Sequence, residues 1–146
     1  MHLNFMQFLM KKIFVLFLLA LSLSGFSQSR VGFPINKVRA EFSDPVYNLK
    51  SMVHDTSTFL VLQEKHAVVI HRFGRDSVCN KTYVTPEDST IANQMASTYD
   101  AIYEPLSNLE WIVRQQNEVL EVEMVAIENK NGLSQPTFQW TRAKKK

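Results

Sequence analysis

Hydrophobic and polar positions follow two different periods along this chain. In residues 47–84 and again in residues 109–142, short runs of β-branched and aromatic residues are separated by turn-forming residues, which predicts β-strands. Between these runs, apolar residues recur every three or four positions over residues 91–103, which predicts an amphipathic α-helix. The same helical spacing appears earlier, over residues 35–42. The pattern therefore predicts a short helix, strands, a long helix and strands again.

The long helix is expected at about residues 86–104. Thr85 can cap its first turn, Pro86 suits the first helical position, and Pro105 ends it. The short N-terminal helix is expected at about residues 35–43. Connections between the predicted strands are too short for parallel crossovers, so neighbouring strands are expected to be antiparallel. The predicted fold class is α+β, with the long helix packed on an antiparallel sheet of about six or seven strands in two runs.

One strand of the second run indicates a buried side and a solvent-facing side. Leu120, Val122 and Met124 point one way, whereas Glu121 and Glu123 point the other way. After Met124 the apolar residues change sides. This shift predicts a bulge or a two-sided environment in the strand.

The last predicted strand follows an Asn-Gly turn at residues 131–132. Because proline cannot donate a backbone hydrogen bond, Pro136 favours an edge position for this strand. Phe138 and Trp140 lie on one face of it. On an edge strand part of that face is exposed, so both rings are candidates for a protein-binding surface.

The first 27 residues have the composition of a cleaved signal peptide. Lysines at positions 11 and 12 form a positive n-region, residues 13–23 form an apolar h-region, and small residues precede a cleavage site after Ser27. Met10, directly before the lysines, fits a translation start. A membrane-spanning helix needs about 20 apolar residues, more than this run has, so no span is expected after cleavage. The protein is therefore expected to be exported, to the periplasm or beyond the cell.

The mature chain is expected to form a single domain over residues 28–142, followed by a basic tail at residues 143–146. Without the signal the acidic and basic residues balance, and four basic residues fall in the last five positions. The domain itself is thus acidic and lacks the basic surface that nucleic-acid binding needs. The single cysteine, Cys79, excludes an internal disulfide and is expected to be buried in an exported protein.

The stretch HAVVIHRFGRDSVC holds the residue types most typical of chemistry. Its two histidines, His66 and His71, are five residues apart, so neither a strand nor a helix points both at one metal ion. No zinc-type spacing or acidic cluster supports them. Neither a metal nor a cofactor is therefore expected.

His71 and Cys79 are the remaining candidate pair. A three-residue turn at residues 74–76 places them opposite each other, where an imidazole can lower the pKa of a thiol. A two-residue turn places Val78 opposite His71 instead. Nothing in the sequence supplies an oriented third group or an oxyanion hole. The pair is therefore a weak catalytic candidate, and a β-hairpin is the favoured interpretation.

Carboxylates are the other candidate groups. Glu121 and Glu123 share a strand face about 7 Å apart, a spacing that resembles an acid–base pair. Alternate charges are more typical of the solvated face of a strand, and such a face can meet a basic partner. No Gly-x-Ser-x-Gly motif is present, and four glycines leave no phosphate-binding loop.

The segment VGFPINKVRAEFSD at residues 31–44 resembles the opening of small envelope domains in the group of outer-membrane assembly lipoproteins and β-lactamase-inhibitor proteins. The resemblance implies helices packed on an antiparallel sheet and a function in binding other proteins. The chain lacks the lipoprotein cysteine and the paired cysteines common in that group. The signal and general composition also resemble small exported bacterial proteins without an assigned activity. No catalytic residue is implied.

The sequence thus predicts a small exported domain, not an enzyme, that binds a protein or another component of the cell envelope. The partner surface is expected to include Phe138, Trp140, Glu121 and Glu123. Two alternatives stay open: a thiol enzyme that uses Cys79 with His71, and a small-ligand carrier with an apolar cavity between sheet and helix.

Overall fold

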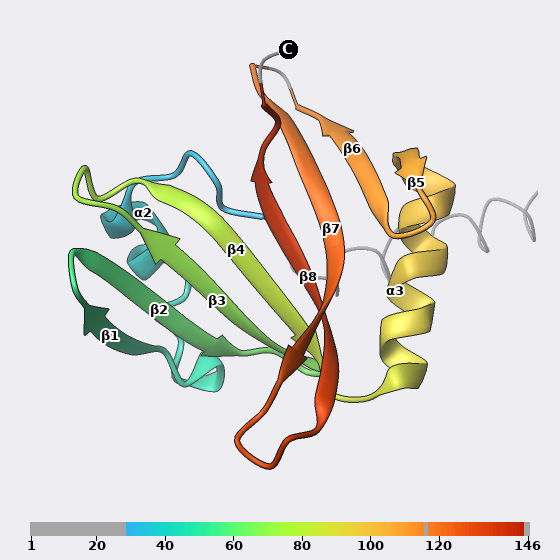
Figure 1. Ribbon diagram of the computed structural model, residues 1–146. Helices are drawn as coiled ribbons and strands as arrows, with labels where there is room; N and C mark the ends of the chain where they lie inside the picture. Colours follow the sequence, from blue (N-terminus) through green and yellow to red (C-terminus); the bar gives the residue numbers. More distant parts are fainter. Residues whose placement is uncertain (1–28, 116, 145–146) are drawn as a thin grey trace, which may run out of the picture.

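Eight strands and two α-helices make up the part of the chain that the computed structural model describes, residues 29–115 and 117–144 (Figure 1). In chain order the elements are α2 (Ile35–Glu41), the 3₁₀ helix η1 (Pro45–Tyr47), β1 (Lys50–His54), β2 (Ser57–Gln63), β3 (Ala67–Phe73), β4 (Cys79–Pro86), α3 (Ser89–Ile102), β5 (Glu104–Ser107), β6 (Glu110–Arg114), β7 (Val119–Glu128) and β8 (Ser134–Arg142). The predicted α+β class is confirmed, with more sheet than expected.

All eight strands belong to one antiparallel sheet in the order β1-β2-β3-β4-β8-β7-β6-β5. The expected count of six or seven strands is wrong because β5 was not anticipated. That strand is only four residues long, contains Pro105, and follows α3 almost directly. A segment this short has too few positions for a period-two pattern to be recognised.

The sheet consists of two meanders joined along a single seam. Strands β1–β4 form one and β5–β8 the other, and β4 pairs with β8 from Lys81↔Thr141 to Val84↔Phe138. Strand β8 therefore lies in the middle of the sheet, and the predicted edge position is wrong. Pro136 is tolerated because the pairing of β8 with β4 ends at Phe138, so this part of β8 pairs only with β7, at Ala126.

The long helix begins later than predicted. Asp88 is its N-cap, and the side chain accepts a hydrogen bond from the backbone N–H of Ile91 at 2.8 Å. Thr85 and Pro86, predicted to start the helix, remain in β4, where Pro86 lies opposite Ala67 of β3. The expected short helix is confirmed as α2, with Pro34 at its N-cap position.

Both helices pack against one face of the sheet, the helix-covered face. Phe42, which caps α2 at its C-terminal end, lies over the β1–β4 half, and α3 lies beside the β5–β8 half (Figure 1). The Tyr99 ring of α3 has its centroid 5.0–5.7 Å from the rings of Phe138, Trp111 and Trp140. These rings fill the interface between α3 and the sheet.

Strand β7 has no bulge. Its pairing with β8 runs without a register shift from Leu120↔Arg142 to Glu128↔Ser134. The change of apolar side after Met124 instead marks a change of environment, because both Met124 and Val125 are half-buried. The predicted turn at residues 131–132 is confirmed, with Gly132 at a φ of 74°.

The opposite face of the sheet, the open face, is not covered by α2 or α3. One row of side chains on it runs across six neighbouring strands: Val61, Ile70, Tyr83, Gln139, Glu123 and Glu110. All residues of both edge strands, β1 and β5, are exposed, and β5 also carries a proline and a register shift.

Within the described ranges, no helix is long and apolar enough to cross a membrane. The predicted signal segment at residues 1–27 and the last two lysines of the predicted basic tail lie outside the described residues.

Candidate functional site

The β3–β4 hairpin contains the first candidate pair, but neither predicted turn is present. Phe73 pairs with Cys79, and His71 pairs with Thr82, because a bulge between Arg72 and Phe73 shifts the register. The loop spans residues 74–78 and is closed by a hydrogen bond from the backbone N–H of Ser77 to the carbonyl of Gly74 at 3.0 Å. Both pairings that the sequence left open, with Cys79 or with Val78 opposite His71, are therefore wrong.

Thr82 connects the two residues instead. Its hydroxyl oxygen lies 2.9 Å from Nδ1 of His71 and 3.7 Å from Sγ of Cys79. All three side chains are buried. His71 also stacks on the ring of Phe42, with centroids 6.0 Å apart. The three groups form a polar cluster inside the core rather than a cleft open to substrate.

The chain segment before α2 covers this cluster. The N–H of Gly32 donates to the carbonyl of Cys79 at 2.8 Å, and the N–H of Cys79 donates to the carbonyl of Phe33 at 2.9 Å. The N–H of Arg30 donates to the hydroxyl of Thr82 at 3.4 Å. These bonds hold residues 29–34 across the end of β4 and separate Cys79 from solvent.

Burial keeps both candidate groups uncharged at neutral pH. It lowers the pKa of His71 to about 3, and the positive charge of Arg30 acts in the same direction. Burial also raises the pKa of the Cys79 thiol. Because the thiolate is the nucleophile, a thiol with a raised pKa beside a neutral imidazole is not activated. The geometry thus argues against thiol chemistry at this pair.

The other described histidines lie elsewhere. His66 is at the start of the hairpin, 3.2 Å from Glu87, and His54 is exposed on β1 beside Asp55. In the described part of the chain, no group of three or more histidine, cysteine or acidic side chains is arranged to hold a metal ion.

The predicted aromatic partner surface is wrong. Phe138 is 0% exposed and Trp140 is 2% exposed, because β8 is a central strand and both rings point toward α3. The two acidic residues predicted with them have the expected orientation. Glu121 is half-buried and Glu123 is exposed, both on the open face.

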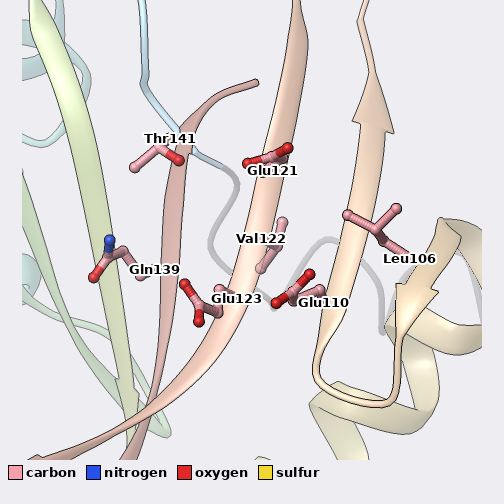
Figure 2. A pocket seen from close by; sticks show the side chains of 7 residues that line it. All are labelled: Leu106, Glu110, Glu121, Val122, Glu123, Gln139 and Thr141. Carbon is pink, nitrogen blue, oxygen red and sulfur yellow. The ribbon is translucent and has the colours of Figure 1, made fainter. Parts of the chain in front are cut away.

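A third carboxylate, from Glu110, joins them. Glu110 of β6 lies directly opposite Glu123 of β7. Figure 2 shows the three carboxylates projecting from β6 and β7 beside Gln139 and Thr141 of β8. They line a cavity of about 100 Å³. The position of Glu110 could have been inferred from the sequence. If the apolar residues Trp111 and Val122 are paired on the buried face, their neighbours Glu110 and Glu123 lie opposite each other on the other face.

These three carboxylates lie outside the ion pairs of the described chain. Several other acidic side chains form ion pairs: Glu41 with Arg30, Glu87 with His66, Glu104 with Arg114, and Glu118 with Arg142. Within residues 29–115 and 117–144, no such partner lies beside Glu110, Glu121 or Glu123. We call these three residues the acidic half of the open face.

The other half of the open face is mostly apolar but also carries two cations, Arg72 and Lys81. Its half-buried apolar side chains come from β2, β3 and β4: Phe59, Val61, Val68, Ile70 and Tyr83. We call them the apolar half. Between the two halves lies β8, whose accessible side chains on this face, Gln139 and Thr141, are uncharged, whereas Thr137 is buried. Across the seam of the sheet, the open face therefore changes from mainly apolar with two cations to acidic.

A second cavity, of about 260 Å³, lies between the end of α3 and the neighbouring strand β6. Its lining includes Tyr103, Ile112 and the exposed ion pair between Glu104 and Arg114. It is not the apolar cavity under the helix that a ligand carrier requires, because the Tyr99 ring cluster fills that interface.

Comparison of the chain with protein-family models, with curated proteins and with solved structures finds no match. The resemblance of residues 31–44 to envelope domains stays a prediction. The open face is the surface on which a function can be argued from geometry.

Proposed function

We propose that this protein is a small exported domain that binds another protein of the cell envelope through the open face and does not act as an enzyme. The observation that carries this proposal is the contrast between the two faces of the sheet. One face is filled by α2, α3 and their aromatic contacts, whereas the other presents apolar side chains, with Arg72 and Lys81 among them, beside three carboxylates that form no ion pair with a described residue.

Three features support a role in binding. A contiguous apolar area next to polar groups is typical of protein interaction sites. The side chains stand on strands, so their relative positions are held by the sheet and little order has to be gained on binding. The predicted signal peptide supports export.

The test is site-specific photo-crosslinking in cells that export the protein. A photoactivatable phenylalanine analogue replaces Tyr83 on the open face, and in a matched control it replaces Asn93, an exposed residue of α3. We expect one discrete crosslinked product from position 83 and none from position 93, in both cases with the same amount of exported protein.

Equal crosslinking from both positions, or none from position 83, would contradict binding through the open face. Turnover of a substrate by the purified protein would contradict the non-enzymatic part of the proposal.

A further inference from the structure

We infer that the partner presents an amphipathic α-helix that lies along β8, with an apolar flank on the apolar half of the open face and a basic flank on the acidic half. This inference rests on the proposed function and adds the chemistry of the partner.

The first argument is backbone hydrogen bonding. The strands under the open face are interior strands, each paired with a neighbour on both sides. Their backbone N–H and C=O groups are used within the sheet, so a partner strand has no ladder to join at this surface. A partner that binds here must satisfy its own backbone groups, and an α-helix does so within a single segment.

The second argument is dimensional. Strands are about 4.8 Å apart, so β4 and β7, which flank β8, are about 10 Å apart, close to the diameter of an α-helix. The uncharged side chains Gln139 and Thr141 lie beneath such a helix, whereas Thr137 is buried. Alternate residues on a strand are about 7 Å apart, so this pair spans between one and two helical turns.

The third argument is charge complementarity. Glu121 and Glu123 follow each other along β7 on the same face, about 7 Å apart. Two lysines or arginines four positions apart on a helix are separated by about 6 Å along its axis, which matches this spacing. On the other flank, Tyr83 and Ile70 provide apolar contacts. Two cations lie on this flank as well: Arg72 is opposite Lys81, and Lys81 has its Nζ 5.8 Å from the centroid of the Tyr83 ring.

The acidic half also costs stability. Glu110 lies directly opposite Glu123, and like charges at opposite positions of an antiparallel pair are destabilising. No cation of the described chain relieves this repulsion. A basic flank of a partner would relieve this repulsion. Removing the charges of Glu110 and Glu123 is therefore expected to weaken binding of the partner without lowering the stability of the fold.

The test uses three labelled helical peptides of about 14 residues. The first has leucines along one flank and lysines along the adjacent flank. In the second, glutamine replaces the lysines, and in the third, glutamine replaces the leucines. We expect the first peptide to bind most tightly by fluorescence anisotropy, and its affinity to fall as salt is added.

Variants of the protein identify the contact. The double variant Glu110→Gln/Glu123→Gln is expected to bind the first peptide about threefold to tenfold more weakly at low salt, while its melting temperature stays the same or rises. The matched control is Glu128→Gln, which also removes a carboxylate from β7. Glu128 is exposed, but it lies on the side of the strand opposite to Glu121 and Glu123. This variant should leave binding unchanged.

Equal binding of the first and second peptides, or unchanged binding by the double variant, overturns the inference. If crosslinking from Tyr83 persists in that case, only the partner chemistry is wrong and the open face remains the binding surface. If that crosslinking also fails, the proposed function is overturned as well.

Discussion

His71 makes the stability of the fold depend on pH in a predictable direction. The imidazole is fully buried, and no hydrogen-bond partner lies near its Nε2 among the described residues. Its pKa falls from an ordinary value of 6.5 to about 3, mainly because burial disfavours the charged ring and also because Arg30 is nearby. The unfolded chain therefore takes up a proton near pH 6.5, whereas the folded chain does so only near pH 3.

The consequence is a loss of stability in acid. Above pH 6.5 the ring is neutral in both states, so this group has no effect. Below pH 6.5 the unfolded state binds a proton that the folded state does not bind, and each pH unit costs about 1.4 kcal/mol until the folded pKa is reached. Between pH 7.5 and pH 5 the free energy of unfolding should therefore fall by about 2 kcal/mol through His71 alone.

The assay is urea denaturation of the wild type and of His71→Gln at both pH values. Glutamine keeps a polar group near Thr82 but does not titrate, so the stability advantage of the wild type over the variant should shrink by about 2 kcal/mol on acidification. The control is Asn93→Gln, which changes an exposed residue of α3 that carries no ionisable group, so its difference in stability from the wild type should not change with pH. A constant difference between wild type and His71→Gln would refute the reasoning.

Four further predictions follow from the core, the helix start, the covered thiol and the predicted processing. Truncating Tyr99 to alanine removes the ring at the centre of the interface between α3 and the sheet. The free energy of unfolding, measured by denaturant titration, should fall by about 3–5 kcal/mol. A loss below about 1 kcal/mol would show that the packing of α3 does not depend on this ring. Asp88→Ala removes the N-cap of α3 and should cost about 1 kcal/mol, measured in the same way, whereas an unchanged midpoint would count against the cap. Cys79 should react with iodoacetamide at least about tenfold more slowly in the native protein than in denaturant; equal rates would mean that the segment covering it opens freely. N-terminal sequencing of the exported protein should begin at Gln28, and a chain that retains the first 27 residues would contradict the predicted signal.

Local patterns in the sequence predicted the elements that depend on local physics. The stripe of apolar residues in α3 and the alternation in β7 are visible without knowing what they pack against, because each element must bury one side. The orientation of Glu121 and Glu123 was predictable for the same reason. The start of α3 was not, because Thr85-Pro86 and Asp88 are both good N-terminal signals and the pairing of β4 with β3 decides between them.

Pairing between distant segments was the part that the sequence did not reveal. At Pro136 itself, β8 pairs with one strand only, as the proline indicated. Two residues later β8 also pairs with β4, and Phe138 is buried. The β3–β4 loop likewise closes with Phe73 opposite Cys79, which already excludes a pair of His71 with Cys79, and the bulge beyond it places Thr82 opposite His71. A register change of this kind moves a side chain by one position along its strand. It therefore changes which residues meet at the candidate site, although the amino-acid composition of the strands stays the same.

The seam between β4 and β8 also has a consequence for how the chain folds. Among the described strands it is the one pairing that joins segments far apart in sequence, since Thr82 meets Trp140 while every other pair is a hairpin between consecutive strands. Hairpins close quickly, but a long loop must lose more entropy before its ends gain contacts. The two meanders can therefore form first, and their docking along this seam, with the Tyr99 cluster assembling at the same time, should set the folding rate.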